Sequence, residues 1–121
     1  IGPARTQHTD SRDDGLTLRI DYGQTSVVVT GCITSNGEKE IVSSGAAAAC
    51  DALIVSRGGT EAATCAEWVE AAKPKVALIT GKNPANSVRI RLQKYGATVY
   101  AAKENGVMTL FSDGQEITVE P

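Results

Sequence analysis

Apolar and polar residues alternate near the start of the chain. Leu16, Leu18 and Ile20 are apolar, and the residues between them are polar. This period of two is typical of a half-buried strand. The run SVVVT at 26–30 is rich in β-branched residues and follows a short turn at 23–24. We therefore expect two strands that pair as a β-hairpin.

Helical patterns alternate with continuous apolar runs in the middle of the chain. The runs ALIV at 52–55 and KVALIT at 75–80 are of the kind that is buried inside a parallel sheet. Between and around them, the pattern predicts helices at about 38–47, at 60–73 and from 84 or 85 to 95.

Local signals mark two of these helices. Thr60 is a residue type that caps helix N-termini, and Pro74 ends the same helix because proline cannot continue it. In the next helix Val88, Leu92 and Tyr95 recur at a spacing of four and three, which predicts a stripe that faces the core.

Three further strands are expected after residue 96. The runs ATVYAA, GVMTLF and QEITVE are separated by turn signals at 104–106 and 113–114. These turns contain Asn-Gly and Asp-Gly, which are strong hairpin signals.

The predicted order is β-β-α-β-α-β-α-β-β-β, which is typical of an α/β fold. Hairpins at both ends predict a mixed β-sheet, with about three helices as crossovers. Residues 1–15 are polar and aperiodic, so we expect a flexible leader followed by a single α/β domain at 16–121. Because the chain begins with Ile1 rather than Met, we expect it to be a piece of a longer protein.

Composition excludes several classes of protein. The chain has 121 residues, of which 41% are hydrophobic and 21% charged, as in ordinary globular domains. Aromatic residues are 4% of the chain, too few for a base-stacking platform. The apolar runs fall far short of the ~20 residues that span a bilayer, so we expect no membrane contact by this segment.

Charge is unevenly distributed along the chain. The net charge is −2, but residues 73–103 carry seven Lys or Arg and no acid. Such a segment could contact phosphates. A solvated helix face with two lysines beside a strand would give the same pattern.

Loops that follow buried strands are where an α/β sheet places its chemistry. Three such loops, at 30–32, 56–60 and 80–83, contain glycine. They are not P-loops, since Val76 stands where a P-loop needs glycine and no G-x-G-x-x-G occurs. A Cys32–His8 pair is the one nucleophile and base available, and a structural role for both is favoured.

Other polar and thiol residues have simpler interpretations. Cys50 and Cys65 lie in alanine-rich runs and are expected to be buried fillers. With Cys32 they make three cysteines, so they do not form a complete disulfide framework. Asp13 and Asp14 are expected to be a solvated pair in a turn.

The strands and turns together resemble the later half of a metallo-β-lactamase-like domain. The closest kind is the one at the C-terminus of ComEC-type DNA-uptake (competence) proteins. Five segments carry the resemblance: 16–23 (LTLRIDYG), 26–31 (SVVVTG), 74–79 (PKVALI), 106–110 (GVMTL) and 112–114 (SDG). The resemblance implies one half of an αββα sandwich, in which two sheets stack face to face with helices outside.

The chain departs from this family where the family binds metal. The resemblance implies a metal-bridging Asp after the second strand, where this chain has Cys32, and a histidine pair in a later loop, where it has Arg57 and Gly58. The next loop, often histidine-bearing, reads KNPAN at 82–86. The His-x-His-x-Asp-His motif of the family's first half is absent. Because a guanidinium repels cations, we expect no catalytic residue, no metal and no cofactor.

The resemblance therefore implies a non-catalytic, degenerate module of a protein related to DNA uptake. It would act as a scaffold, or contact nucleic-acid backbones weakly through Arg57, Lys82, Arg89, Arg91 and Lys94. An alternative is one half of an active metal-dependent phosphodiesterase or nuclease whose ligands lie outside this chain. A third hypothesis is a protein-interaction domain with no nucleic-acid role.

Partners follow from the single predicted sheet. With helices on one face only, the other apolar face would meet water, and a large apolar patch usually marks an interface. We expect this face to contact the N-terminal half of the same fold or a second copy of the chain in a homodimer. DNA is a further candidate partner. The resemblance places the module on the extracellular side of a membrane-anchored parent.

Overall fold

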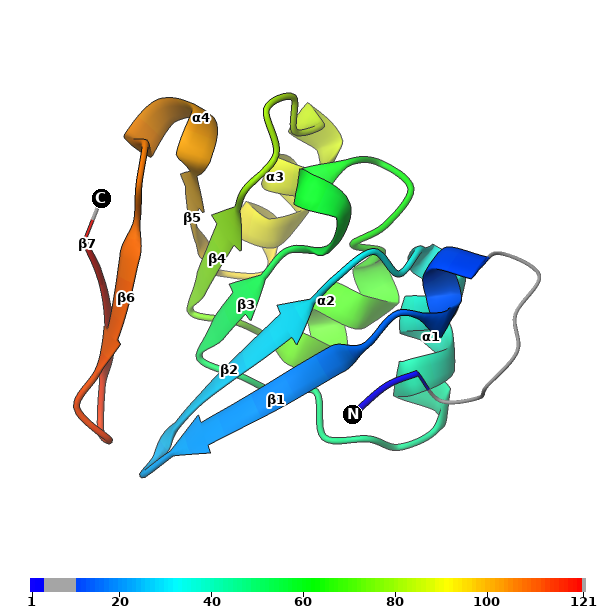
Figure 1. The fold of residues 1–121 in the computed structure, drawn as a ribbon, viewed down its shortest axis with the longest axis horizontal. Helices are drawn as coiled ribbons and strands as arrows, with labels where there is room; N and C mark the ends of the chain where they lie inside the picture. The colour runs from blue at the N-terminus through cyan, green and yellow to red at the C-terminus, as the bar shows by residue number, and fades with distance from the viewer. Residues whose placement is uncertain (4–10, 121) are drawn as a thin grey trace.

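A computed structural model describes residues 1–3 and 11–120 of the chain. They form an α/β fold with a mixed five-stranded sheet, a two-stranded hairpin and three substantial helices (Figure 1). The strands are β1 (Thr17–Tyr22), β2 (Thr25–Thr30), β3 (Ala52–Ile54), β4 (Val76–Ile79), β5 (Thr98–Ala101), β6 (Thr109–Ser112) and β7 (Ile117–Glu120). The helical segments are η1 (Ser11–Asp14), α1 (Ser35–Ser43), η2 (Ser56–Gly59), α2 (Ala66–Ala72), α3 (Asn86–Lys94) and α4 (Ala102–Asn105).

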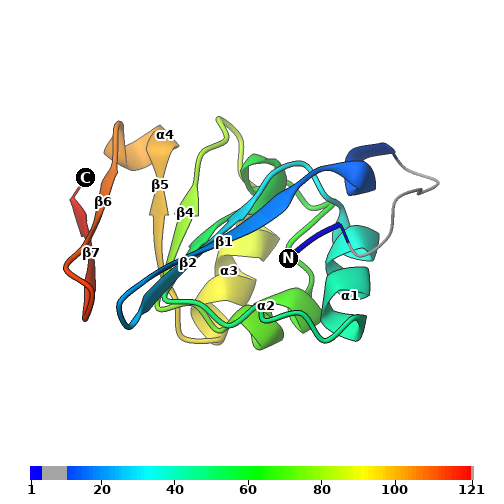
Figure 2. The ribbon, with the colours of Figure 1, turned by 60° about the horizontal axis from the view of Figure 1, so that its bottom comes forward.

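The order of strands in the main sheet follows their order along the chain, β1-β2-β3-β4-β5. β1 and β2 are antiparallel, and β2 to β5 are parallel. The crossovers through α1, α2 and α3 all step in the same direction. Right-handed crossovers of this kind place their helices on one face of the sheet, and Figure 2 shows the three helices together on one side. The predicted α/β class and mixed sheet are confirmed.

The core lies between the sheet and these helices. Val28 of β2 and Trp68 of α2 are completely buried. Of the stripe predicted on the third helix, Val88 and Leu92 are also completely buried, and Tyr95 packs against the same cluster. Full burial of an aliphatic side chain contributes about 1.5–3 kcal/mol, so this stripe fixes α3 against the sheet.

The second helix begins later than its sequence predicts. α2 starts at Ala66, so Thr60 is not its N-cap. Thr64 has a φ of 61°, a left-handed conformation that cannot continue into an α-helix. The segment 60–65 therefore forms turns ahead of the helix. α1 differs in the opposite direction, since it begins and ends a few residues earlier than the predicted 38–47.

The C-terminal strands form their own sheet. β6 pairs with β7 across the turn at Asp113 and Gly114, as predicted. The signal at 104–106 is not a hairpin, because α4 occupies that segment and β5 and β6 belong to different sheets. The Asn105 side chain accepts the Ala101 N–H at 3.1 Å, a local bond that stabilises this helical turn.

The tip of the β6–β7 hairpin rests against the β1–β2 turn. The Gly114 carbonyl accepts the Gln24 N–H at 2.5 Å, and the hydroxyl oxygens of Thr25 and Ser112 are 2.6 Å apart. Gly23 has a φ of 59°, and a Cβ at this position would collide with the backbone of Gly114. Glycine is therefore required where the two turns meet.

The sheet face that turns away from α1, α2 and α3 is apolar and is called the open face below. Leu18 and Ile20 of β1 are 46% and 55% exposed on it, and Tyr22 is 61% exposed. Cross-strand register continues the same face through Ile54 and Leu78. The alternation predicted for β1 is confirmed, but its apolar side points outward because the helices cover the other side.

The described parts of the predicted leader contact the domain. Gly2 forms an antiparallel bridge with Thr17. Asp13 is 3% exposed, and its carboxylate accepts the backbone N–H of Thr34 at 2.6 Å and the Thr34 hydroxyl at 2.9 Å. Asp13 is therefore not the solvated residue that its sequence context predicts. Residues 4–10, with His8, lie outside the described residues, and the boundary after residue 15 stays a prediction.

Candidate functional site

Three loops meet at one edge of the main sheet, called the carboxyl edge below. They follow β2, β3 and β4, which are parallel neighbours and so end on the same side. The Thr30 hydroxyl donates to the Ile54 carbonyl at 2.5 Å, and the Ser56 hydroxyl donates to the Ile33 carbonyl at 2.6 Å. Side-chain bonds to backbone carbonyls therefore tie the first two loops together.

The second and third loops touch through their glycines. A Cβ on Gly58 would lie 2.8 Å from the Gly81 Cα, closer than real Cβ contacts. Neither position can hold a side chain without moving the other loop. The residues beside these glycines in the chain are Arg57 and Lys82, so the backbone segments that carry the two basic residues are neighbours.

Arg57 adopts an unusual backbone conformation at this edge. Its φ of 52° and ψ of 34° are left-handed, which costs about 1–2 kcal/mol for a residue other than glycine. Its backbone N–H donates to the Gly31 carbonyl at 2.9 Å, which holds the turn in place. Strain of this kind is concentrated at functional sites.

The guanidinium of Arg57 has no acceptor among residues 1–3 and 11–120. Its Nε atom is buried and unpaired, and no hydrogen bond or ion pair joins its other nitrogens to those residues. Leaving a buried donor unpaired costs about 1–3 kcal/mol. The Thr60 hydroxyl, three residues further on, is also buried without a partner there.

Cys32 lies at the same edge with an exposed side chain. The part of the chain that the structure describes contains no group of three or more His, Cys, Asp or Glu placed to hold a metal ion. The predicted Cys32–His8 pair involves a residue outside that part. At this edge the described side chains offer a thiol and two cations.

The five basic residues predicted to contact nucleic acid are in different situations. Arg89 forms an ion pair with Glu104 at 2.8 Å, and Arg91 donates to the Thr64 carbonyl at 2.6 Å. Both bonds hold parts of the chain together. Lys82 and Lys94 are exposed, and no described acid forms an ion pair with either.

A buried carboxylate, which the sequence did not single out, lies behind this edge. Glu38 of α1 is completely buried. It accepts the backbone N–H groups of Thr64 and Cys65 at 2.8 and 2.9 Å. Burial raises the pKa of Glu38 to about 7, although those two bonds and the charge of Arg91 oppose the rise. Glu38 thus provides the hydrogen-bond acceptors for two backbone N–H groups in the segment that leads into α2.

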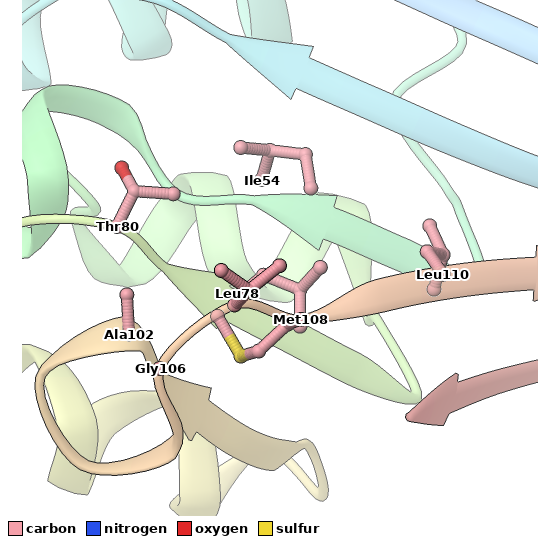
Figure 3. A pocket seen from close by; sticks show the side chains of 8 residues that line it. Ile54, Leu78, Thr80, Ala102, Gly106, Met108 and Leu110 are labelled. Atoms are coloured by element: carbon pink, nitrogen blue, oxygen red, sulfur yellow. The ribbon is translucent and has the colours of Figure 1, made fainter. Parts of the chain in front are cut away.

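An apolar groove of about 620 Å³ lies on the open face. Figure 3 shows Ile54 and Leu78 of the main sheet facing the segment that carries Met108 and Leu110. Thr80 lines the end of the groove, where the third loop of the carboxyl edge begins. No sequence signal predicted that Met108 lines a groove, because the groove forms only when α4 turns the chain back over the sheet.

None of the described helices is long and apolar enough to cross a bilayer. The arrangement defines a one-sided α/β layer with a basic carboxyl edge and an apolar face that stays exposed along β1.

Comparisons with known proteins give one distant relationship. No family model matches the chain, and no solved structure matches it. The chain is 26% identical over 114 residues to ComE operon protein 3 of Bacillus subtilis (strain 168), the competence protein ComEC. The match covers 89% of this chain and 15% of the relative. The chain is therefore distantly similar to a competence protein and spans a small part of that protein's length.

Proposed function

We propose that this chain is a non-catalytic module of a protein related to DNA uptake, and that its open face packs against another part of that protein. The observation that carries the proposal is the exposure of Leu18, Ile20 and Tyr22 on one continuous apolar face. Contiguous apolar surface of this kind is rare on the outside of a monomer. The groove beside Met108 and Leu110 extends the same face.

The favoured occupant of the open face is a segment of the parent chain, namely the N-terminal half of the same fold. The distant relative is much longer than this chain, since the match covers 15% of it. Enough chain therefore exists in such a protein to supply a second sheet. A second copy of this chain is the other candidate occupant.

The absence of catalysis is proposed from the residues at the carboxyl edge. Cys32 and Arg57 stand where the resemblance to metallo-β-lactamase-like domains implies metal ligands. A permanent cation at that place disfavours a metal ion. The alternative is one half of an active metal-dependent phosphodiesterase or nuclease. Metal analysis and a nuclease assay of the full-length protein with zinc or manganese distinguish the two, because bound metal with cleavage contradicts a non-catalytic role.

A pair of matched substitutions tests the open face. Ile20→Glu places a charge on the open face, and Ile90→Glu places the same charge on α3, where the side chain is 60% exposed. In the isolated chain both should change stability by less than about 0.5 kcal/mol, since exposed sites tolerate change. In the full-length protein, Ile20→Glu should lower the melting temperature and Ile90→Glu should not.

Two results would contradict the proposed packing. Equal effects of both substitutions in the full-length protein would mean that the open face is not covered there. Sedimentation of the isolated chain as a dimer that Ile20→Glu dissociates would identify a second copy as the occupant in place of the N-terminal half.

A further inference from the structure

The guanidinium of Arg57 is a cation without an acceptor at a rigid position. Its backbone is left-handed and is held by the Gly31 carbonyl at 2.9 Å. Its Nε is buried and unpaired, and no described residue pairs with the rest of the group. Native proteins leave few buried donors unpaired, and each one calls for an explanation such as a missing ion. The two terminal nitrogens of the guanidinium are not among the buried unpaired atoms, so an anion that reaches this edge from solvent would contact those nitrogens.

Backbone donors are available beside this guanidinium. The N–H groups of Gly81, Lys82 and Asn83 donate to no acceptor in the described chain. Lys82 and Asn83 are exposed residues. The contact between Gly58 and Gly81 holds this loop next to Arg57. Backbone N–H groups without an acceptor, together with nearby cations, can bind a phosphate group.

Acidic side chains are absent from the loops that form the carboxyl edge. Residues 30–34, 56–60 and 80–85 contain Arg57 and Lys82 but no Asp or Glu. Glu61, which follows the second loop, has its Oε1 bonded to the Ser87 hydroxyl at 2.8 Å. A carboxylate from outside the loops, that of Asp13, accepts the Thr34 N–H at 2.6 Å. No described acid forms an ion pair with Arg57 or Lys82, so both cations can attract an anion.

We propose that the carboxyl edge binds a phosphate group, held by the guanidinium of Arg57, the ammonium of Lys82 and the backbone N–H groups of residues 81–83. Arg57 can present two parallel N–H donors to a phosphate, and Lys82 adds a mobile point charge. The inference rests on the proposed function only for the source of the phosphate, since a protein related to DNA uptake would offer it as a nucleic-acid backbone.

Arg89 and Arg91 take no part in this site. Arg89 is paired with Glu104 at 2.8 Å, and Arg91 is bonded to the Thr64 carbonyl at 2.6 Å. Lys94 is exposed near the end of α3, on an element that does not belong to the carboxyl edge. Lys94 therefore gives a matched control for the loss of one positive charge.

Inorganic phosphate and a short DNA duplex are the two probes. Each is titrated into the 15N-labelled chain at two salt concentrations, and the amide resonances of residues 81–83 are followed. We expect both probes to shift these resonances. Arg57→Gln and Lys82→Gln should each weaken phosphate binding, Arg57→Gln by about tenfold because a charge-assisted bidentate contact is lost. Lys94→Gln should leave the affinity within about twofold.

Each other outcome has a defined meaning. No shift at residues 81–83 with either probe would overturn the site. Equal weakening by Arg57→Gln and Lys94→Gln would also overturn it, because binding would then depend on overall charge. If Arg57→Gln fails to fold, Lys82→Gln on its exposed loop decides alone. Shifts with phosphate but not with DNA would keep the site and contradict a nucleic-acid backbone as the source of the phosphate.

Discussion

The Glu38 carboxylate accepts the backbone N–H of Cys65 at 2.9 Å, although the two residues lie in different helical regions of the chain. The same carboxylate accepts the Thr64 N–H at 2.8 Å. These bonds provide acceptors for the backbone N–H groups just before α2. The sequence predicted Thr60 as the cap of this helix, but α2 begins six residues after it. The start of α2 therefore depends on a residue of α1, and the two helices are fixed to each other at this point.

The protein should lose stability as the pH rises through the range set by Glu38. Burial raises the pKa of Glu38 from 4.5 to about 7 in the folded protein. Between these values the folded state binds more protons than the unfolded state, so the free energy of unfolding falls as the pH rises. The contribution of Glu38 is fully present below pH 4.5 and lost above pH 7, and amounts to roughly 3 kcal/mol. Urea unfolding at several pH values measures it.

Glu38→Gln is the control for this pH dependence. Glutamine keeps one acceptor for the amides of Thr64 and Cys65 but cannot ionise. The variant should be less stable than the wild type at low pH and should lack the fall between pH 5 and pH 7, within the window given above. Identical pH profiles for the two proteins would show that Glu38 does not titrate in this range.

The three cysteines should differ sharply in reactivity. Cys32 is exposed, whereas burial raises the pKa of Cys50 to about 11 and that of Cys65 to about 12. At pH 8 only about one Cys50 thiol in a thousand is ionised, and the thiolate is the reactive form. A thiol reagent such as DTNB should modify one cysteine rapidly in the folded protein. Cys50 is buried, as predicted, whereas Cys65 is only partly buried. Cys32→Ala should abolish this fast phase, and fast reaction of a second thiol in that variant would contradict the protection of the other two.

The contact between Gly58 and Gly81 should make Gly58→Ala unusually destabilising. A Cβ there would lie 2.8 Å from the Gly81 Cα, and the φ of Gly58 is 62°. Gly45 has a similar φ of 78° with no neighbouring atom within 4 Å. Gly45→Ala should therefore cost about 1 kcal/mol for its conformation alone. Gly58→Ala should cost about 1–3 kcal/mol more from overpacking. Chemical unfolding of both variants compares them, and equal losses would mean that the loops can separate freely.

Replacing Arg57 with glycine should separate stability from binding. Arg57 and Lys73 are both left-handed, with φ of 52° and 39°. Glycine removes this strain but increases the entropy of the unfolded chain. Arg57→Gly and Lys73→Gly should each raise the free energy of unfolding by up to about 1 kcal/mol. Only Arg57→Gly should weaken phosphate binding. Loss of binding in both variants would show that the effect comes from net charge.

Local patterns predicted most of the strands and the core-facing side of α3. The alternation from Leu16 to Ile20 and the stripe through Val88 and Leu92 depend on neighbouring residues, so they could be read from the chain. The burial of Asp13 and Glu38 depends on partners more than twenty residues away. Local sequence patterns do not predict contacts between residues so far apart in the chain. The late start of α2 has the same cause.

The location of the candidate site could be predicted from the sequence. Which basic side chains are free to act there could be predicted only in part. Parallel strands end on the same side, so the loops that carry Cys32, Arg57 and Lys82 had to meet. The engagement of Arg89 with Glu104 could not be foreseen, because it joins α3 to the helical turn that replaced an expected hairpin. That the guanidinium of Arg57 has no acceptor could also not be predicted, because it depends on which side chains surround Arg57 in the fold.

The contact between the β1–β2 turn at Gly23 and the β6–β7 turn at Gly114 has a consequence for the order in which the chain folds. The Thr25–Ser112 contact joins residues separated by 87 positions. Closing so long a loop is entropically costly until the intervening crossovers have formed. Docking of the C-terminal hairpin is therefore expected to come last, after the main sheet and its helices. The apolar groove, which Met108 and Leu110 line together with Ile54 and Leu78, would be completed only in that last step.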